Sequence, residues 1–183
     1  MKQLIAAVGL VTMGVMMGNV AGVQAHPTGE IKRVKGDAQS PILASVVVPA
    51  GSTLYYLSGQ VPAVSDPSKP AGSIEAYGDT KAQAISVFTK IQKLLTDQGL
   101  TLGDVVKLTV YLVGDPKTGG KLDFKGFSEA YAQFFGTPSQ PNLVTRTTLQ
   151  VVALANPAYL VEIEATAVKS AHADAHADKP KGP

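Results

Sequence analysis

The chain has 183 residues, 45% hydrophobic and 16% charged, so it can bury a core and allows one domain plus extensions. Sixteen Lys and Arg against fourteen Asp and Glu leave a formal net charge of +2, which argues against a nucleic-acid-binding protein. Cysteine is absent, which excludes disulfides, thiol nucleophiles and cysteine-ligated metals. Carboxylates, hydroxyls, Lys and Arg must therefore carry any chemistry.

The first 25 residues have the pattern of a secretory signal peptide. A basic start at Lys2 precedes an apolar stretch over residues 4–23, and Ala25 stands directly before a polar segment. The apolar stretch is just long enough to span a bilayer as an uncleaved anchor, but its glycines and Ala25 favour cleavage. We expect an exported protein, periplasmic or secreted, that has no membrane segment after cleavage, with residues 26–39 forming an N-terminal extension.

The other end, residues 169–183, is predicted to be a disordered tail because nothing apolar recurs there at a folding period. It holds His172 and His176, each followed two residues later by an aspartate. These side chains could bind a metal weakly, but a solvated tail is favoured because no rigid shell would hold the imidazoles. We therefore expect no metal site.

The domain between these ends, residues 40–168, begins with two predicted strands at residues 42–48 and 53–61. The Pro-Ala-Gly-Ser segment between them favours a hairpin. Residues 62–78 form a proline-rich loop. A helix is then predicted to begin at Thr80, with Gln83 completing a capping box, and to end before Gly99.

A half-buried strand is expected over residues 105–113, where apolar and polar side chains alternate. A second helix should begin near Asp123 and end at Gly136. Its aromatic residues recur at helical spacing and are assigned to the core, with no stacking role: Phe124, Phe127, Tyr131 and Phe134.

Two final strands, residues 143–154 and 159–168, are expected to form a hairpin about Asn156. The element order is then β-β-α-β-α-β-β. Since the helices can cover one face of a sheet, the economical fold class is α+β, a two-layer sandwich.

The last two strands carry the side chains best suited to chemistry. Arg146 shares a strand face with Thr148, and Glu162 shares one with Glu164; we expect both faces to point away from the core. A solvated surface ion pair is the simplest interpretation. A buried arginine, however, would suit a small carboxylate, and a desolvated glutamate could exchange protons with water. Hairpin geometry does not place Arg146 opposite Glu162, so a shared site would lie between subunits or need irregular pairing.

The chain resembles the RidA/YjgF family, the reactive-intermediate deaminases also labelled L-PSP endoribonucleases. The resemblance runs from about residue 40 to residue 168. No single motif is specific, but five of them occur in order with family-like spacing: Ser58-Gly59-Gln60-Val61-Pro62, residues 103–112, Tyr131 with Phe134-Phe135-Gly136, residues 146–151 and residues 161–165.

The resemblance implies a chorismate-mutase-like fold, a homotrimer with ligand clefts between subunits, and no metal or cofactor. Characterised members hydrolyse 2-imino or enamine acids to 2-keto acids and ammonia. Arg146 matches the arginine that binds the substrate carboxylate, and Glu162 matches the glutamate that positions water together with a backbone carbonyl near Thr148. Ser58 and Gly59 match residues that line the cleft, and Ser128 stands where the family commonly has asparagine.

Two functions follow as hypotheses. The first is a deaminase acting on small 2-imino or enamine acids, with the imine, enamine or keto acid as its small-molecule partner. The alternative is a non-catalytic protein that binds small carboxylates in the same cleft between subunits. Ribonuclease action is disfavoured by the near-neutral charge and by the lack of histidine in the matched strands.

Overall fold

The computed structural model describes residues 29–171 of the chain. The predicted signal peptide and nearly all of the predicted tail, including both of its histidines, lie outside the described residues. Within residues 29–171, no helix is both long enough and apolar enough to cross a bilayer.

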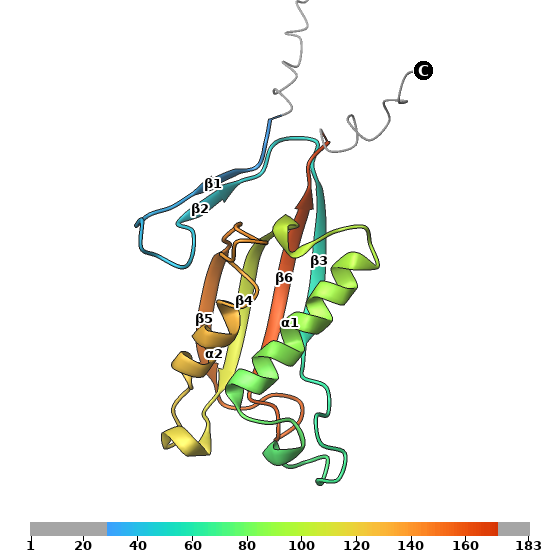
Figure 1. The fold of residues 1–183 in the computed structure, drawn as a ribbon, viewed down its shortest axis with the longest axis vertical. Coiled ribbons are helices and arrows are strands. Elements are labelled where there is room, and N and C mark those ends of the chain that lie inside the picture. The colour runs from blue at the N-terminus through green and yellow to red at the C-terminus, as the bar shows by residue number, and fades with distance from the viewer. Residues whose placement is uncertain (1–28, 172–183) are drawn as a thin grey trace, which may run out of the picture.

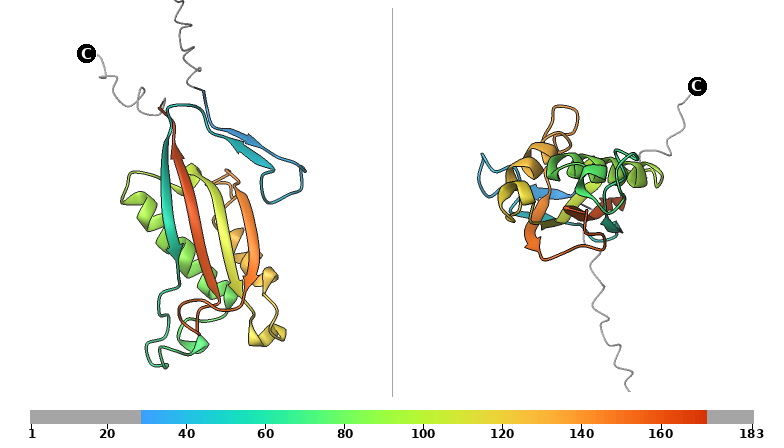
Figure 2. Two further views of the ribbon diagram at one scale, coloured as in Figure 1. Left: turned by 180° about the vertical axis from the view of Figure 1, so that it is seen from behind. Right: turned by 90° about the horizontal axis from the view of Figure 1, so that it is seen from below.

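A four-stranded sheet with two helices on one face forms the body of the protein (Figure 1). The strands are β3 (Thr53–Gln60), β4 (Val105–Val113), β5 (Thr145–Val151) and β6 (Val161–Lys169), in the order β3-β6-β4-β5. Helices α1 (Thr80–Thr96) and α2 (Phe124–Tyr131) cover one face, and seen from behind the opposite face is open (Figure 2). The predicted two-layer α+β architecture is confirmed.

A separate two-stranded sheet precedes the body, made by β1 (Lys32–Val34) and β2 (Ser45–Val47). Three short 3-10 helices complete the described secondary structure: Ile74–Ala76, Leu102–Asp104 and Pro116–Thr118. Strand β1 lies in the segment that the sequence suggested only as an extension, because three residues are too few to show a period.

The core fills the space between the helices and the sheet. The rings of Phe127, Tyr131 and Phe135 pack around Phe88 of α1, with centroids 5.7–6.3 Å from that ring. These aromatic side chains are buried, and each contributes on the order of 1.5–3 kcal/mol of hydrophobic stabilisation. The assignment of Phe127 and Tyr131 to the core is confirmed, but that of Phe124 is wrong, because this first residue of α2 is 49% exposed. Phe134 is only partly buried.

Both predicted helices form, with corrected ends. Helix α1 is capped by Asp79, whose carboxylate accepts a hydrogen bond from the Ala82 amide, so the predicted Thr80–Gln83 capping box is wrong. The side chain of Gln83 is buried instead, where it donates to the carbonyl of Ala158 and accepts from the amide of Leu160. Helix α2 begins near Asp123 as predicted, with Asp123 as its N-cap, but it ends at Tyr131, well before Gly136.

Neither predicted hairpin forms. Strand β2 pairs with β1 rather than with β3, and β5 runs parallel to β4 while β6 inserts between β3 and β4. Parallel strands need a long crossover connection, and the segment containing α2 supplies it between β4 and β5. Alternation along a strand shows which of its faces is buried, but not which strand lies beside it.

Candidate functional site

Arg146 lies on the helix-covered face of the sheet. It pairs with the buried Leu108 across the parallel β4–β5 ladder, so both side chains point toward the helices. The guanidinium carbon lies 4.5 Å from the ring centroid of Tyr131, 5.1 Å from that of Phe127 and 5.8 Å from that of Phe124. Three aromatic rings of α2 therefore surround the cation on one side.

Two polar atoms at this place are buried without a partner. Among the described residues, neither Nη1 of Arg146 nor Oγ1 of Thr148 has a hydrogen-bond partner, and the two residues share one face of β5. Burial lowers the pKa of Arg146, and the neighbouring Tyr131 only partly opposes that shift. A desolvated guanidinium without an acceptor is costly, so this arrangement favours an anionic partner or ligand.

Arg146 lies on a strand at the edge of the sheet. Only β4 pairs with this strand among the described strands. Ser128 lies on α2 at helical spacing from Phe124 and Tyr131, and its side chain is half-buried. Arg146, Thr148 and Ser128 together are called the arginine half-site here.

Glu162 lies on the other, open face of the sheet. Glu162 pairs with Tyr111 of β4, whereas Arg146 pairs with Leu108, three residues earlier in the same strand. Since side chains alternate along a strand, positions three residues apart point to opposite faces of the sheet. The carboxylate of Glu162 packs over Gly59 of β3 so closely that a Cβ at that position would overlap it. The β3–β6 register shifts between Leu57 and Gln60, which allows this approach. Glu162, Gly59 and the neighbouring, exposed Ser58 form the glutamate half-site.

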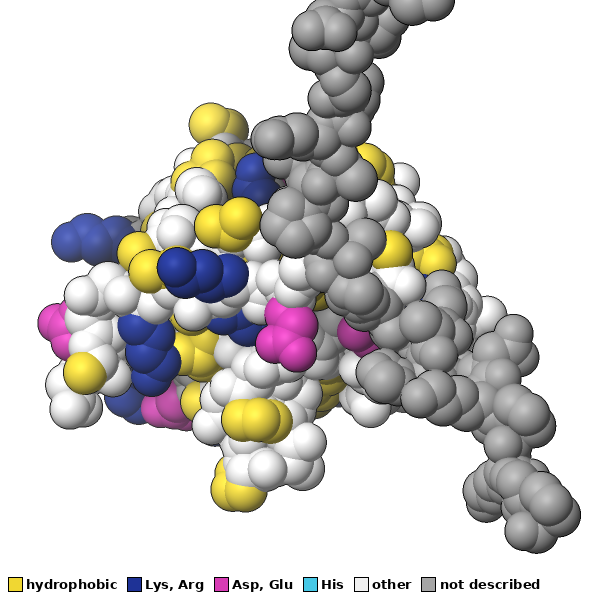
Figure 3. Space-filling view, turned by 90° about the horizontal axis from the view of Figure 1, so that it is seen from above, with side chains coloured by type: hydrophobic (Ala, Val, Ile, Leu, Met, Phe, Trp, Pro, Cys, Tyr) yellow, Lys and Arg dark blue, Asp and Glu magenta, His cyan; other side chains and the backbone are white. Residues whose placement is uncertain are grey.

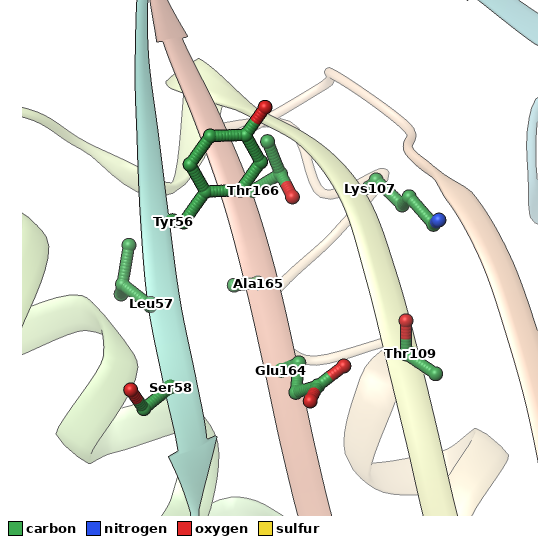
Figure 4. A pocket seen from close by; sticks show the side chains of 8 residues that line it. All are labelled: Tyr56, Leu57, Ser58, Lys107, Thr109, Glu164, Ala165 and Thr166. Carbon is green, nitrogen blue, oxygen red and sulfur yellow. The ribbon is translucent and has the colours of Figure 1, made fainter.

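The open face is hollowed next to the glutamate half-site. A depression of about 370 Å³ is lined by residues of β3, β4 and β6: Tyr56, Leu57, Ser58, Lys107, Thr109, Glu164, Ala165 and Thr166 (Figure 4). The Tyr111 hydroxyl donates to Oε2 of Glu164 at 3.2 Å, and partial desolvation together with this carboxylate raises the pKa of Tyr111. Tyr56 is 76% exposed on this face, a large apolar surface for a strand with no layer above it.

The two half-sites therefore occupy opposite faces of one sheet. The expectation that Arg146 and Glu162 both point away from the core is wrong, because Arg146 lies under α2. Sequence reasoning also missed that Phe124, Phe127 and Tyr131 cover the guanidinium. Their spacing showed that they share a helix face, but not that an arginine of the edge strand lies beneath it.

No cluster of metal ligands is found in the part of the chain that the structure describes. Within residues 29–171, no group of three His, Asp or Glu side chains could hold a metal ion. Figure 3 views the end that carries the β1–β2 hairpin, where separate Lys and Arg side chains lie among hydrophobic and uncharged ones.

In a comparison with known protein families, residues 43–169 match the family model described as Endoribonuclease L-PSP. A RutC family protein of Pyrococcus horikoshii is 37% identical over 125 residues, covering 68% of this chain and 86% of that protein. The Escherichia coli K12 protein TdcF, which carries the name of a reactive intermediate deaminase, is 33% identical over 119 residues, or 65% of this chain and 81% of TdcF.

Two solved structures share both fold and sequence with this chain. The crystal structure of E. coli TdcF with bound serine is 31% identical, with a TM-score of 0.50 over 76% of this chain and 98% of that chain. YyfB of Yersinia pestis, described as a member of the conserved Rid protein family, is 26% identical with a TM-score of 0.55, covering 75% and 98% of the two chains.

Proposed function

Because the chain belongs to the Endoribonuclease L-PSP family, also called RidA/YjgF, and has its chorismate-mutase-like fold, we propose that it hydrolyses small 2-imino and enamine acids to 2-keto acids and ammonia. One observation carries the proposal: Arg146, beside an edge strand, is half-buried, and its buried Nη1 has no acceptor among the described residues. A small carboxylate would supply two acceptor oxygens in the geometry that a guanidinium prefers. The relative TdcF, crystallised with serine, binds a small molecule that carries a carboxylate.

The complete site is proposed to form between two copies of the chain. Arg146 and Glu162 lie on opposite faces of one sheet, so one chain alone cannot direct both at one substrate. If the β5 edge of one copy meets the open face of the next, the arginine half-site faces the partner's glutamate half-site. A head-to-tail contact gives a ring when its rotation closes, and we propose that it closes as a homotrimer. The open face, with Tyr56 exposed, would then be covered.

The proposed reaction needs only groups of this chain and water. An enamine acid first gains a proton on its terminal carbon and loses one from its nitrogen, both exchanged with water, and becomes the 2-imino acid. Arg146 of one copy binds the carboxylate. Glu162 of the neighbouring copy, with the backbone carbonyl near Thr148 beside Arg146, orients a water molecule and accepts its proton. The oxygen bonds to C2 as the π pair of the C=N bond moves to nitrogen, which takes that proton from Glu162. Glu162 then accepts the proton of the new C2 hydroxyl and passes it to nitrogen, the C–N bond breaks, ammonia leaves, and the carbon–oxygen bond becomes the keto carbonyl. One water is consumed, with no net electron transfer.

The wild-type protein is the first test. We expect purified oligomer to accelerate ammonia release from 2-aminoacrylate generated in situ, measured against a reaction without protein. Positioning plus acid–base catalysis supports an acceleration of at least about 10²-fold. Binding of pyruvate without any acceleration would instead identify a carboxylate-binding protein and reject the deaminase.

Gly59 provides a test of the glutamate half-site that leaves the glutamate itself in place. In Gly59→Ala, the new methyl group must push the flexible end of Glu162 away. The fold can absorb this shift, since the obstructing atoms belong to a side-chain tip, but catalytic geometry cannot. We expect kcat to fall about 10- to 100-fold, since displacing a reacting group by about 1 Å has costs of this order.

The control for this prediction is Gly72→Ala, at a position where a Cβ meets no atom within 4 Å. Both variants should keep wild-type secondary structure by circular dichroism, and Gly72→Ala should keep wild-type turnover. Unchanged kcat in Gly59→Ala would show that the Glu162 carboxylate does not act from its position over Gly59.

A further inference from the structure

The N-terminal hairpin, defined as β1, β2 and the turn that joins them (residues 32–47), is fastened to the sheet beside the arginine half-site. Arg33 of β1 makes three hydrogen bonds there. Its Nη1 donates to the carbonyl of Leu143 at 2.6 Å and to that of Val105 at 3.0 Å, and its Nη2 donates to that of Gly103 at 2.7 Å. Arg33 precedes residue 43, where the match to the family model begins.

These bonds tie down the chain directly before Arg146. Leu143 lies three residues upstream of it, and the amide of Leu43, also in the hairpin, donates to the carbonyl of Val144 at 2.9 Å. The next residue is held as well, because the Thr145 hydroxyl donates to the carbonyl of Val106 at 2.9 Å. The three residues before Arg146 are thus all held by hydrogen bonds: Leu143 and Val144 by the hairpin, and Thr145 by β4.

The hairpin also contacts Tyr131, one of the aromatic residues that pack against Arg146. The Tyr131 hydroxyl donates to the carbonyl of Pro41 at 3.1 Å, while the Tyr131 ring lies 4.5 Å from the guanidinium carbon of Arg146. One segment therefore contacts both the strand that carries the cation and the ring that packs against it.

The shape of an arginine suits the three bonds seen at position 33. Burial lowers the pKa of Arg33, with Asp104 opposing the shift, and the carbonyl acceptors offset part of the cost of desolvation. A planar guanidinium reaches three carbonyls from two nitrogens, whereas a lysine ammonium is a single point.

We infer that Arg33 is a positioning residue for the substrate carboxylate, because it sets where β5 begins and hence where the Arg146 guanidinium lies. The inference rests on the proposed role of Arg146. Arg33 itself does not touch the substrate. A merely structural role would lower thermal stability and leave the affinity for a carboxylate unchanged, so affinity separates the two roles.

The test compares Arg33→Lys with Lys32→Gln, which removes a cation at the adjacent, exposed position of the same strand. In the full oligomer, we expect the dissociation constant of pyruvate, measured by calorimetry, to rise about tenfold in Arg33→Lys, since a misplacement near 1 Å costs this much or more. KM for a 2-imino acid formed in situ should rise in parallel with kcat nearly unchanged, because carboxylate binding is common to substrate and transition state. Lys32→Gln should match the wild type.

A second variant keeps the test decisive if Arg33→Lys does not fold. Tyr131→Phe keeps the ring over Arg146 and removes the bond to Pro41, so it should also weaken pyruvate binding. Unchanged pyruvate affinity in every folded variant would overturn the inference and leave the deaminase intact. Wild-type binding without turnover would reject the deaminase, and the inference would then be judged on affinity alone. If the wild type does not bind pyruvate, both fail.

Discussion

Arg146→Met should strongly lower kcat/KM for deamination without destabilising the protein. Each charge-assisted hydrogen bond to a carboxylate is worth about 1.5–3 kcal/mol, so losing two should lower kcat/KM by about 10²- to 10⁴-fold. Most of the loss should be in KM, because the carboxylate is bound before and during the reaction. Steady-state kinetics on a 2-imino acid formed in situ measures both constants.

The stability of the same variant is an independent part of this prediction. The Nη1 of Arg146 is buried without an acceptor, and desolvation of the guanidinium opposes its charge. Methionine keeps an apolar stem and offers sulfur to the rings of Tyr131 and Phe127, which replaces part of the lost cation–π contact. We expect a thermal midpoint at or above that of the wild type, as is common where a site is built for ligand rather than for stability.

Two results would contradict this account of Arg146. Retained kcat/KM would remove it from the site, and a large fall in the thermal midpoint with unchanged pyruvate affinity would make it a structural residue. Arg146→Lys is the matched control, because it keeps the charge and loses the planar fork. It should bind pyruvate more weakly than the wild type and more tightly than Arg146→Met.

Glu162→Gln should also have a large effect, on kcat rather than on KM. Glutamine occupies nearly the same volume over Gly59 but cannot accept a proton from water. Loss of a general base lowers turnover by about 10²- to 10⁴-fold, with KM close to the wild-type value. Glu164→Gln, two residues along the same open face, is the control and should retain wild-type kcat. Equal losses in both variants would indicate that the open face needs negative charge rather than one placed base.

Much of the scaffold could be predicted from the sequence, because it depends on local patterns. The alternation in residues 105–113 reports the buried face of β4, and the helical spacing of Phe127 and Tyr131 reports the core face of α2. The same aromatic spacing placed the start of α2 near Asp123, which is the N-cap of that helix.

The arrangement of the site could not be predicted in the same way, because it depends on which strands are neighbours. The hairpin expected about Asn156 is absent, and β6 lies between β3 and β4. That insertion and the parallel β4–β5 pairing place Arg146 under α2 and leave Glu162 on the open face. The bonds from Arg33 to carbonyl groups were equally hidden, since a carbonyl acceptor leaves no signature in the sequence.

The central claim is that one active site uses Arg146 of one copy and Glu162 of another, and mixed oligomers test it most directly. Arg146→Met and Glu162→Gln, each lowered at least about 10²-fold in kcat/KM, are unfolded together, refolded at equal concentrations and assayed at substrate concentrations below KM. In any closed ring with one contact type, about a quarter of the interfaces then join two intact half-sites. We predict recovery of about a quarter of wild-type activity on this basis.

The control mixture combines Glu162→Gln with the double variant Arg146→Met/Glu162→Gln, in which every interface lacks the glutamate. Differently tagged chains that copurify verify that the subunits have mixed. No recovery in verified mixed oligomers of the two single variants would contradict the account, because a site contained in one chain or one built from other residues gives that result.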